Sequence, residues 1–297
     1  MRRQALVAAT AAVLLTPVSG RAFVRSTSKD NPKACLFWPA RQPSFTLSED
    51  GSRDVDHPTP SAVSSLEAAR LSFQAWTVPN CTDLTFKELG TTSLRTTRND
   101  QVNLVLWRER TCTSVAPSGD ACFANGGCDN LYDCWEHGDT TIALTSVSYN
   151  SRTGVIVDVD IELNGAGYVF TTVDSPPCSS GTVSRHPNCV ATDVQNTLTH
   201  EIGHFLGLDH VSVPDATMFS SAPIGETSKR TLYQDDIDGL CTIYPRGQPP
   251  AYCVPQGSDV IGMGCGCGDA GGLAPLGWLA PLALGWFGRR RSRRAGG

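Results

Sequence analysis

A cluster of histidines in the segment 199–210 is the strongest chemical feature of the sequence. Three of the six histidines, His200, His204 and His210, lie here, with Glu201 beside the first. On a helix, residues four apart project from one face, so His200 and His204 can bind one cation together. Imidazoles at this spacing suit a zinc ion, with Zn–N distances of about 2.0–2.1 Å.

Gly207 allows the third histidine to join the other two. Glycine accepts the left-handed backbone that ends a helix, so His210 can turn back toward the metal. A helix that continued through His210 would place it on the opposite face from His204. Three neutral ligands leave one position for water, as in catalytic zinc sites. Glu201 can take a proton from that water, which predicts peptide hydrolysis without a covalent intermediate.

Composition and the N-terminus indicate an exported protein. The chain has 297 residues and 12 cysteines, and disulfides persist mainly in oxidising compartments. Residues 1–22 are predicted to be a secretory signal peptide, because Arg2 and Arg3 precede a short apolar run and a small-residue cleavage pattern. The net charge is −5 and the part between the two ends is more acidic still. This charge argues against nucleic acid as a partner.

The C-terminal region is predicted to attach the protein to a membrane. Residues 247–264 are rich in Pro and Gly and are predicted to be a linker. Residues 265–297 contain Cys265 and Cys267, a charge-free stretch and an arginine cluster. They resemble the tripartite sorting segments of myxobacterial surface proteins, and an ordinary single-pass anchor is the alternative. The expected location is therefore the cell surface or outer membrane, or the medium after secretion.

The elements that position the histidines follow from hydrophobic periodicity. Strands are predicted over 44–47, 84–89, 102–107, 141–149 and 155–164. Helices are predicted to end near 76, 207 and 244, with caps at Thr59 or Ser61, at Thr192 and at Thr231. This order predicts an α+β fold with one mixed five-stranded sheet and about three helices.

Strand 155–164 alternates between apolar and polar residues. One face is predicted to carry Val157, Val159, Ile161 and Leu163, and the other Asp158, Asp160, Glu162 and Asn164. The apolar face is expected to pack on the core. The acidic face is expected to be in solvent.

The histidine segment resembles the zinc-binding motif of the metzincin peptidases, and within them the matrixin (matrix metalloproteinase-like) group. The likeness covers about residues 34–245, and the peptidase domain is placed at 34–246. It implies one catalytic zinc on the three histidines, with Met218 in the turn beneath the metal and Gly207 as structural support. It also implies that Asp235 and Asp236 are structural acids, and that strand 141–149 pairs with an extended peptide substrate.

Some positions depart from the matrixin pattern. Val211 replaces the usual Ser or Thr, and Phe219-Ser220 replaces Tyr-Pro, so the pocket beyond the scissile bond could differ. His137 imitates the start of a second zinc site, but the next histidine is His186, so His137 is expected at the surface. Calcium on Asp158, Asp160 and Glu162 is a second cofactor that the resemblance allows.

Cys35 lies roughly where a matrixin inhibitory cysteine would sit. Its thiolate could occupy the open position of the zinc. The alternative is a disulfide, because the cysteines of the body form an even set. The sequence does not give the pairing.

The predicted function is that of an exported zinc-dependent endopeptidase acting on proteins or peptides. A surface adhesion or scaffold protein that keeps zinc without turnover is the alternative, and a zinc hydrolase of non-peptide substrates is a third hypothesis. The substrate, its preferred side chains and the oligomeric state are not predicted.

Overall fold

A computed structural model of the protein describes residues 23–57, 61–122, 127–128, 130–179 and 183–252. The predicted signal peptide (1–22) and sorting segment (265–297) lie outside these ranges, as does most of the predicted linker. Within the described ranges, no helix has the length and hydropathy needed to cross a bilayer.

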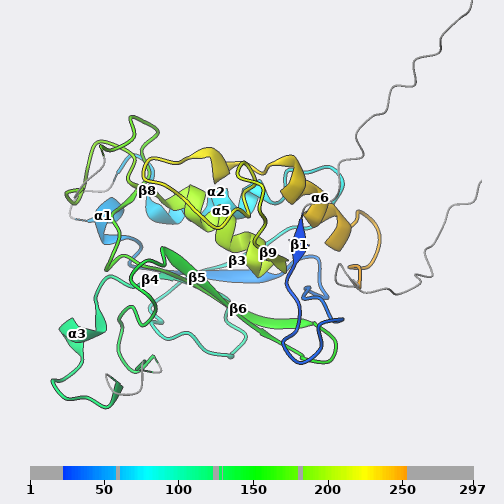
Figure 1. The fold of residues 1–297 in the computed structure, drawn as a ribbon, viewed down its shortest axis with the longest axis horizontal. Helices are drawn as coiled ribbons and strands as arrows, with labels where there is room; N and C mark the ends of the chain where they lie inside the picture. Colours follow the sequence, from blue (N-terminus) through cyan, green and yellow to red (C-terminus); the bar gives the residue numbers. More distant parts are fainter. Residues whose placement is uncertain (1–22, 58–60, 123–126, 129, 180–182, 253–297) are drawn as a thin grey trace, which may run out of the picture. The chain divides into compact units, whose positions relative to one another are not determined.

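A mixed sheet of five strands forms one layer of the fold (Figure 1). The strand order is β3-β2-β4-β6-β5, in which β5 is antiparallel to β6 and the other neighbours are parallel. The bounds are β2 (Ser44–Ser48), β3 (Lys87–Thr92), β4 (Leu104–Trp107), β5 (Ala143–Tyr149) and β6 (Ile156–Leu163). The expected α+β fold with one mixed five-stranded sheet is confirmed. β3 begins later than predicted, because Leu84 is buried in the core ahead of the strand.

The longer helices form a second layer over the sheet (Figure 1). Their bounds are α1 (Arg53–Asp56), α2 (Ser65–Ala75), α3 (Cys112–Val115), α5 (Val194–Phe205) and α6 (Gln234–Ile243), with a 3₁₀ turn η1 (Ser228–Arg230). The three predicted helices correspond to α2, α5 and α6. Helices α1 and α3 are single turns, too short for a hydrophobic period to reveal.

The helices begin later than their predicted caps. The Ser64 hydroxyl accepts the N–H of Glu67 at the start of α2, and the Asp193 carboxylate accepts the N–H of Asn196 at the start of α5. A capping side chain accepts the backbone N–H of the residue three positions later. Several polar residues before each helix satisfy this spacing, so the sequence alone does not identify the cap. Helix α6 likewise begins after Tyr233. The predicted caps at Ser61, Thr192 and Thr231 are therefore wrong, and Thr59, the other candidate for the first helix, lies outside the described residues.

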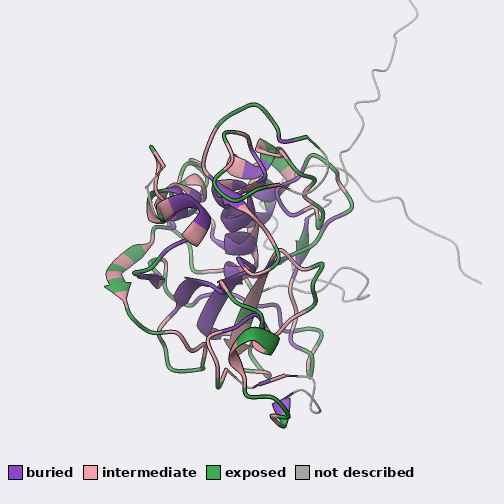
Figure 2. Ribbon diagram, turned by 90° about the vertical axis from the view of Figure 1, so that its left-hand side faces the viewer, coloured by how far each residue is buried: buried purple, intermediate pink, exposed green. Residues whose placement is uncertain are grey.

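An aromatic cluster joins the helices to the sheet. Phe45 of β2 stacks on Phe73 of α2 with ring centroids 3.7 Å apart, and Phe73 meets Phe205 of α5 edge-on at 5.9 Å. Buried residues concentrate on the central helices and strands, whereas exposed residues lie mostly in the connecting loops (Figure 2). This packing fixes α5, the helix that carries the histidine motif, against the rest of the core.

The acidic face of β6 is buried, so the expected solvent exposure is wrong. Asp158, Asp160 and Glu162 are 2%, 3% and 4% exposed. The Asp160 carboxylate accepts the N–H groups of Arg98 and Leu104, so the chain leading into β4 covers it. The alternation of side chains along a strand separates its two faces, but it does not show which segments cover each face.

One residue on the apolar face of β6 is also placed differently. Val157 is 41% exposed, and Ile156 takes its place in the core. The pairing of β5 with β6 shifts register between Ser148 and Tyr149, opposite this point. Such an irregularity turns the following side chains to the other face, which the alternation in the sequence does not reveal.

Arg108 covers the other end of the acidic face, at Glu162. Arg108 is fully buried and donates to Glu162 Oε1 at 2.6 Å and to Asp133 Oδ1 at 3.2 Å. Asp133 belongs to a loop closed by the disulfides Cys112–Cys134 and Cys122–Cys128. The buried charges of Arg108 and Glu162 are therefore paired, as the low dielectric of an interior requires.

Short pairings and two more disulfides close the ends of the domain. β1 (Val24–Arg25) pairs antiparallel with β9 (Leu208–Asp209), and β7 (Phe170–Thr171) pairs with β8 (Thr192–Asp193). β1 lies before residue 34, the predicted start of the peptidase domain. Disulfides link Cys81 with Cys241 and Cys178 with Cys189. The sequence predicted bonded cysteines without their partners, and these pairs supply them.

The buried acids of β6 predict that stability falls as the pH rises. Burial, with charge repulsion from neighbouring acids, raises the pKa of Asp158 to about 6 and that of Asp160 to about 7, from 3.8. Between about pH 4 and pH 7 the folded protein therefore binds more protons than the unfolded chain, and its unfolding free energy decreases. Replacing Asp160→Asn should make that decrease shallower, by up to about 1.4 kcal/mol per pH unit.

Urea unfolding at several pH values from 4.5 to 7.5 measures this slope. Asp30→Asn, at an exposed position, is the control and should keep the slope of the unmodified protein. An equal slope in the Asp160→Asn variant would contradict the prediction.

Candidate metal centre

Helix α5 holds two of the three histidines. Its buried face includes Leu198, Ile202 and Phe205, whereas His200 and His204 are only half-buried and their rings contact the chain after the helix. At the C-terminal end, the Trp38 Nε1–H donates to the Phe205 carbonyl at 2.9 Å. The last carbonyls of a helix lack partners within it, and this bond satisfies one of them.

A reversal at Gly207 ends the helix, as predicted. Its φ is +92°, and its N–H donates to the His204 carbonyl at 2.9 Å. A Cβ at this position would lie 2.3 Å from the Leu36 carbonyl oxygen, so no other residue fits without a backbone shift. The chain then runs through β9 and returns His210 to the helix.

The three imidazoles converge on one point. The Nε2 atoms of His200 and His204 each lie 3.1 Å from Nε2 of His210. Nitrogens bound about 2.0–2.1 Å from a tetrahedral zinc ion lie about 3.3 Å apart, so the triad fits such an ion. Burial and the neighbouring His204 lower the pKa of His200 well below its usual value, which favours the neutral imidazole that binds metal.

Backbone carbonyls fix the orientation of two of these rings. His200 Nδ1 lies 2.6 Å from the Thr217 carbonyl oxygen, and His204 Nδ1 lies 2.9 Å from that of Leu208. A carbonyl oxygen can only accept, so each Nδ1 carries the proton and each Nε2 presents its lone pair to the common point. A metal ligand set needs this tautomer.

Met218 and Asp236 support the triad through packing and hydrogen bonds. Met218 is 1% exposed, and a Cβ on Gly203, between the two helical histidines, would lie 2.1 Å from its Sδ. The Asp236 carboxylate accepts the N–H groups of Thr217 at 2.7 Å and Met218 at 3.0 Å. The Thr217 carbonyl in turn accepts a hydrogen bond from His200 Nδ1–H, so the acid of α6 is connected to a metal ligand through one residue.

Glu201 lies beside the triad and contacts the edge strand. Its side chain is buried, and its Oε2 accepts the Thr145 hydroxyl of β5 at 2.6 Å. Burial raises the pKa of Glu201, and the positive potential of His204 and the Thr145 hydrogen bond partly oppose that rise. Sequence reasoning missed Thr145, because 56 residues separate it from its partner.

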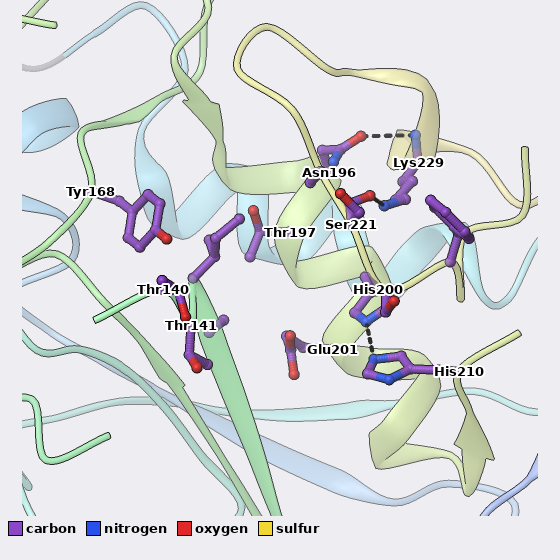
Figure 3. Close-up of a pocket in the computed structure, with 15 residues that line it drawn as sticks. Thr140, Thr141, Tyr168, Asn196, Thr197, His200, Glu201, His210, Ser221 and Lys229 are labelled. Atoms are coloured by element: carbon purple, nitrogen blue, oxygen red, sulfur yellow. Dashed lines mark hydrogen bonds between the residues drawn. The ribbon is translucent and has the colours of Figure 1, made fainter. Parts of the chain in front are cut away.

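A cavity of about 430 Å³ opens next to the triad (Figure 3). One side is formed by the residues that lead into β5, including Thr140 and Thr141, and the other by the chain after Met218. His200, Glu201 and His210 lie at one end, and Asn196 and Lys229 lie farther along, as Figure 3 shows. No sequence motif pointed to Asn196 or Lys229.

The structure does not assemble the other sites weighed from sequence. The His137 side chain is 33% exposed at the surface, as expected, and its Nε2 lies 3.2 Å from Glu162 Oε2. His186 lies elsewhere, bonded to the Asp54 carbonyl. Cys35 is disulfide-bonded, so the inhibitory thiolate is not present. Among the described residues, the triad is the one cluster with metal-ligand spacing whose donors are not disulfide cysteines.

Comparison with known proteins points to one peptidase family. Residues 134–245 match the sequence model of the family described as Matrixin. Metalloendoproteinase 1 of Glycine max is 46% identical over 66 residues, or 22% of this chain and 21% of that protein. Neutrophil collagenase of Homo sapiens is 49% identical over 51 residues, or 17% and 11%. Metalloendoproteinase 5-MMP of Arabidopsis thaliana is 43% identical over 68 residues, or 22% and 19%.

The chain thus spans about a fifth or less of the length of these relatives. Over the shared segment, the matches support a matrixin-like metalloprotease, and matrixins are zinc-dependent endopeptidases. The predicted resemblance is confirmed to that extent.

Replacement of Gly207 tests the reversal that returns His210. In Gly207→Ala we expect a loss of at least about 2 kcal/mol in the free energy of unfolding, from backbone strain and the clash with Leu36. Zinc affinity should fall as His210 is displaced. Urea unfolding and zinc titration measure the two effects.

Gly247→Ala is the matched control. Gly247 also has a positive φ, +69°, but nothing lies within 4 Å of its added Cβ. It should show the strain without the clash and should keep normal zinc affinity. If both variants lose equal stability and bind zinc equally, the role assigned to Gly207 is wrong.

Proposed function

We propose that this protein is an exported zinc-dependent endopeptidase that cleaves peptide bonds with Glu201 as general base. The convergence of the three Nε2 atoms, with a buried carboxylate beside them in an open cavity, carries this proposal. The match to the matrixin family gives independent support over residues 134–245.

His200, His204 and His210 would hold one zinc ion through their Nε2 atoms. When bound there, zinc supplies a Lewis acid that polarises the substrate carbonyl and lowers the pKa of a water molecule. The fold leaves the side facing β5 and the cavity accessible to a substrate. Asp236 and Met218 keep the ligands in place, because they hold the chain that orients His200.

Glu201 moves protons in the proposed reaction. Its carboxylate accepts the proton of the attacking water at one oxygen and later delivers it to the amine that leaves. The raised pKa of Glu201 suits this role, because it makes the carboxylate a stronger base toward the proton of the water. The hydroxyl of Thr145 holds Oε2 and thereby orients the other oxygen.

Strand β5 is the proposed platform for the substrate. It is the edge strand of the sheet and pairs with β6 on one side only. An extended peptide that added itself to the open edge would run past Glu201, which contacts Thr145 in the middle of the strand. This favours a peptide substrate over a small non-peptide ester or amide.

Export and membrane attachment complete the proposal. The disulfides support an oxidising compartment. The signal peptide of residues 1–22, the linker of 247–264 and the sorting segment of 265–297 remain sequence predictions. Together they would place the catalytic domain of residues 34–246 outside the cell and close to its surface.

Replacement of Glu201 separates the peptidase from an adhesion or scaffold protein that keeps zinc without turnover. Glu201→Gln should retain stoichiometric zinc but lower kcat/KM for peptides by about 10²–10⁴-fold, the usual contribution of a general base. Peptide-library cleavage with and without a chelator, with zinc determined by elemental analysis, measures this. Glu49→Gln, at an exposed position, is the control.

Wild-type protein that binds zinc but cleaves no peptide would favour the scaffold alternative. Protein without stoichiometric zinc would contradict the proposal itself.

Replacement of Thr145 tests the orientation of the base. Thr145→Val keeps the size of the side chain but removes the hydroxyl that donates to Glu201. We expect kcat to fall by about tenfold, the value of one hydrogen bond to a charged group. Zinc content should not change, and Thr145→Ser should restore most of the rate. Steady-state kinetics would argue against this role if the Val and Ser variants behaved alike.

A further inference from the structure

In the proposed peptidase, the cavity beside the triad would receive a substrate side chain next to the scissile bond. It begins at His200 and Glu201 and runs between Ile142 and the chain at Phe219. A second hollow of about 320 Å³ shares Ile142, Asn196 and other residues with it, so the two hollows are adjacent. A side chain that entered beside Glu201 would therefore point toward Asn196 and Lys229.

Lys229 places an ammonium group at the wall of this cavity. Its side chain is 3% exposed, and its Nζ donates to the Ser221 carbonyl and lies 5.9 Å from the centre of the Phe219 ring. Both partners line the cavity, and Figure 3 shows the Lys229 side chain directed at Ser221. An ammonium has three N–H donors and no acceptor, so it can bind only acceptor groups.

Asn196 adds a second donor from α5. Its Oδ1 accepts the backbone N–H of Lys229 at 2.8 Å, which fixes the amide orientation. The remaining polar atom of this buried side chain is Nδ2, which can only donate. The inner part of the cavity thus presents donors from two elements, and these favour a ligand that ends in acceptor oxygens.

The charge at this wall is partly balanced by Glu226. Its Oε2 lies 3.4 Å from Lys229 Nζ, and Glu226 lines the second hollow but not the first. Glu201 is the carboxylate that lines the first cavity, next to the metal triad. A ligand carboxylate would therefore contact the Lys229 ammonium from the cavity side, whereas Glu226 contacts the same ammonium from behind.

We propose that this cavity selects an acidic side chain, glutamate above leucine, at a substrate residue flanking the scissile bond, with Lys229 as the residue that sets the preference. This inference rests on the proposed peptidase function. Ser221 and Glu226 occupy two of the three N–H groups of Lys229. A leucine side chain would leave the third N–H and the Asn196 amide without the acceptor that a carboxylate supplies, and buried donors without acceptors cost free energy.

Paired peptides test the preference. A chelator-sensitive library cleavage first identifies a cleaved sequence, and Glu and Leu are then compared at each position flanking the cut. At one of them we expect kcat/KM to be at least about tenfold higher for Glu, the value of one charge-assisted hydrogen bond. Lys229→Met should remove that ratio, whereas Lys229→Arg should keep a preference for Glu.

Two further variants guard against a trivial result. Lys87→Met removes an exposed lysine of β3 and should leave the ratio unchanged. Glu226→Gln removes the competing carboxylate and should raise the ratio severalfold, even if Lys229→Met fails to fold. The inference is overturned if the wild type prefers Leu at both positions, or if neither Lys229→Met nor Glu226→Gln changes the ratio.

Binding separates this inference from the proposed function. The Glu201→Gln variant loaded with zinc should bind the Glu peptide at least about tenfold more tightly than the Leu peptide, measured by calorimetry. If no peptide is cleaved, the peptidase proposal fails. Two peptide mixtures that differ only in having Glu or Leu at one fixed position are then compared by the same calorimetry, and their binding order decides for or against the acidic preference.

Discussion

Three imidazole nitrogens about 3 Å apart are the constraint on which the rest of this structure depends. Two rings come from one helix and are separated by a single turn, but the third lies beyond the helix end and must be returned by a reversal of the chain. The space for that reversal is set by the Leu36 carbonyl, which comes within 2.3 Å of where a Cβ on Gly207 would lie. The N-terminal segment, distant in sequence, thus limits what position 207 can hold.

Polar groups buried around the triad transmit this constraint to the rest of the fold. Asp236 of α6 binds the N–H groups of Thr217 and Met218, and the Thr217 carbonyl orients His200. Burial raises the pKa of Asp236, and these N–H donors act in the opposite direction. A buried carboxylate is tolerated only when such donors satisfy it. The last helix is therefore part of the support of the metal ligands, although it contributes none.

The sequence predicted the parts of the site that follow from local spacing. His200 and His204 four residues apart, and a glycine before His210, fix the triad because helix geometry is periodic. The five strands and three main helices follow from the same periodicity. Contacts between distant segments could not be predicted this way. Thr145 reaches Glu201 only because β5 lies beside α5, and Lys229 meets the cavity only through the fold of the chain after Met218.

The acidic face of β6 is a second example in which contacts with a distant segment could not be predicted from local periodicity. Alternation correctly separated Asp158, Asp160 and Glu162 from the apolar residues, but exposure depended on whether another segment covered them. The chain that carries Arg98 and the buried Arg108 does so. Val157 was misplaced because one irregular pairing with β5 shifts the alternation. Such irregularities arise between strands, and neither strand alone encodes them.

The bond between Cys81 and Cys241 joins positions 160 residues apart, and so encloses most of the domain in one covalent loop. A break in any single peptide bond between them leaves two fragments that are still tied together. For a protein that would meet proteases outside the cell, its own copies included, a nick in a surface loop then costs chain continuity but not the association of α5 with α6. The metal ligands on one fragment and the acid that supports them on the other would remain within a single molecule.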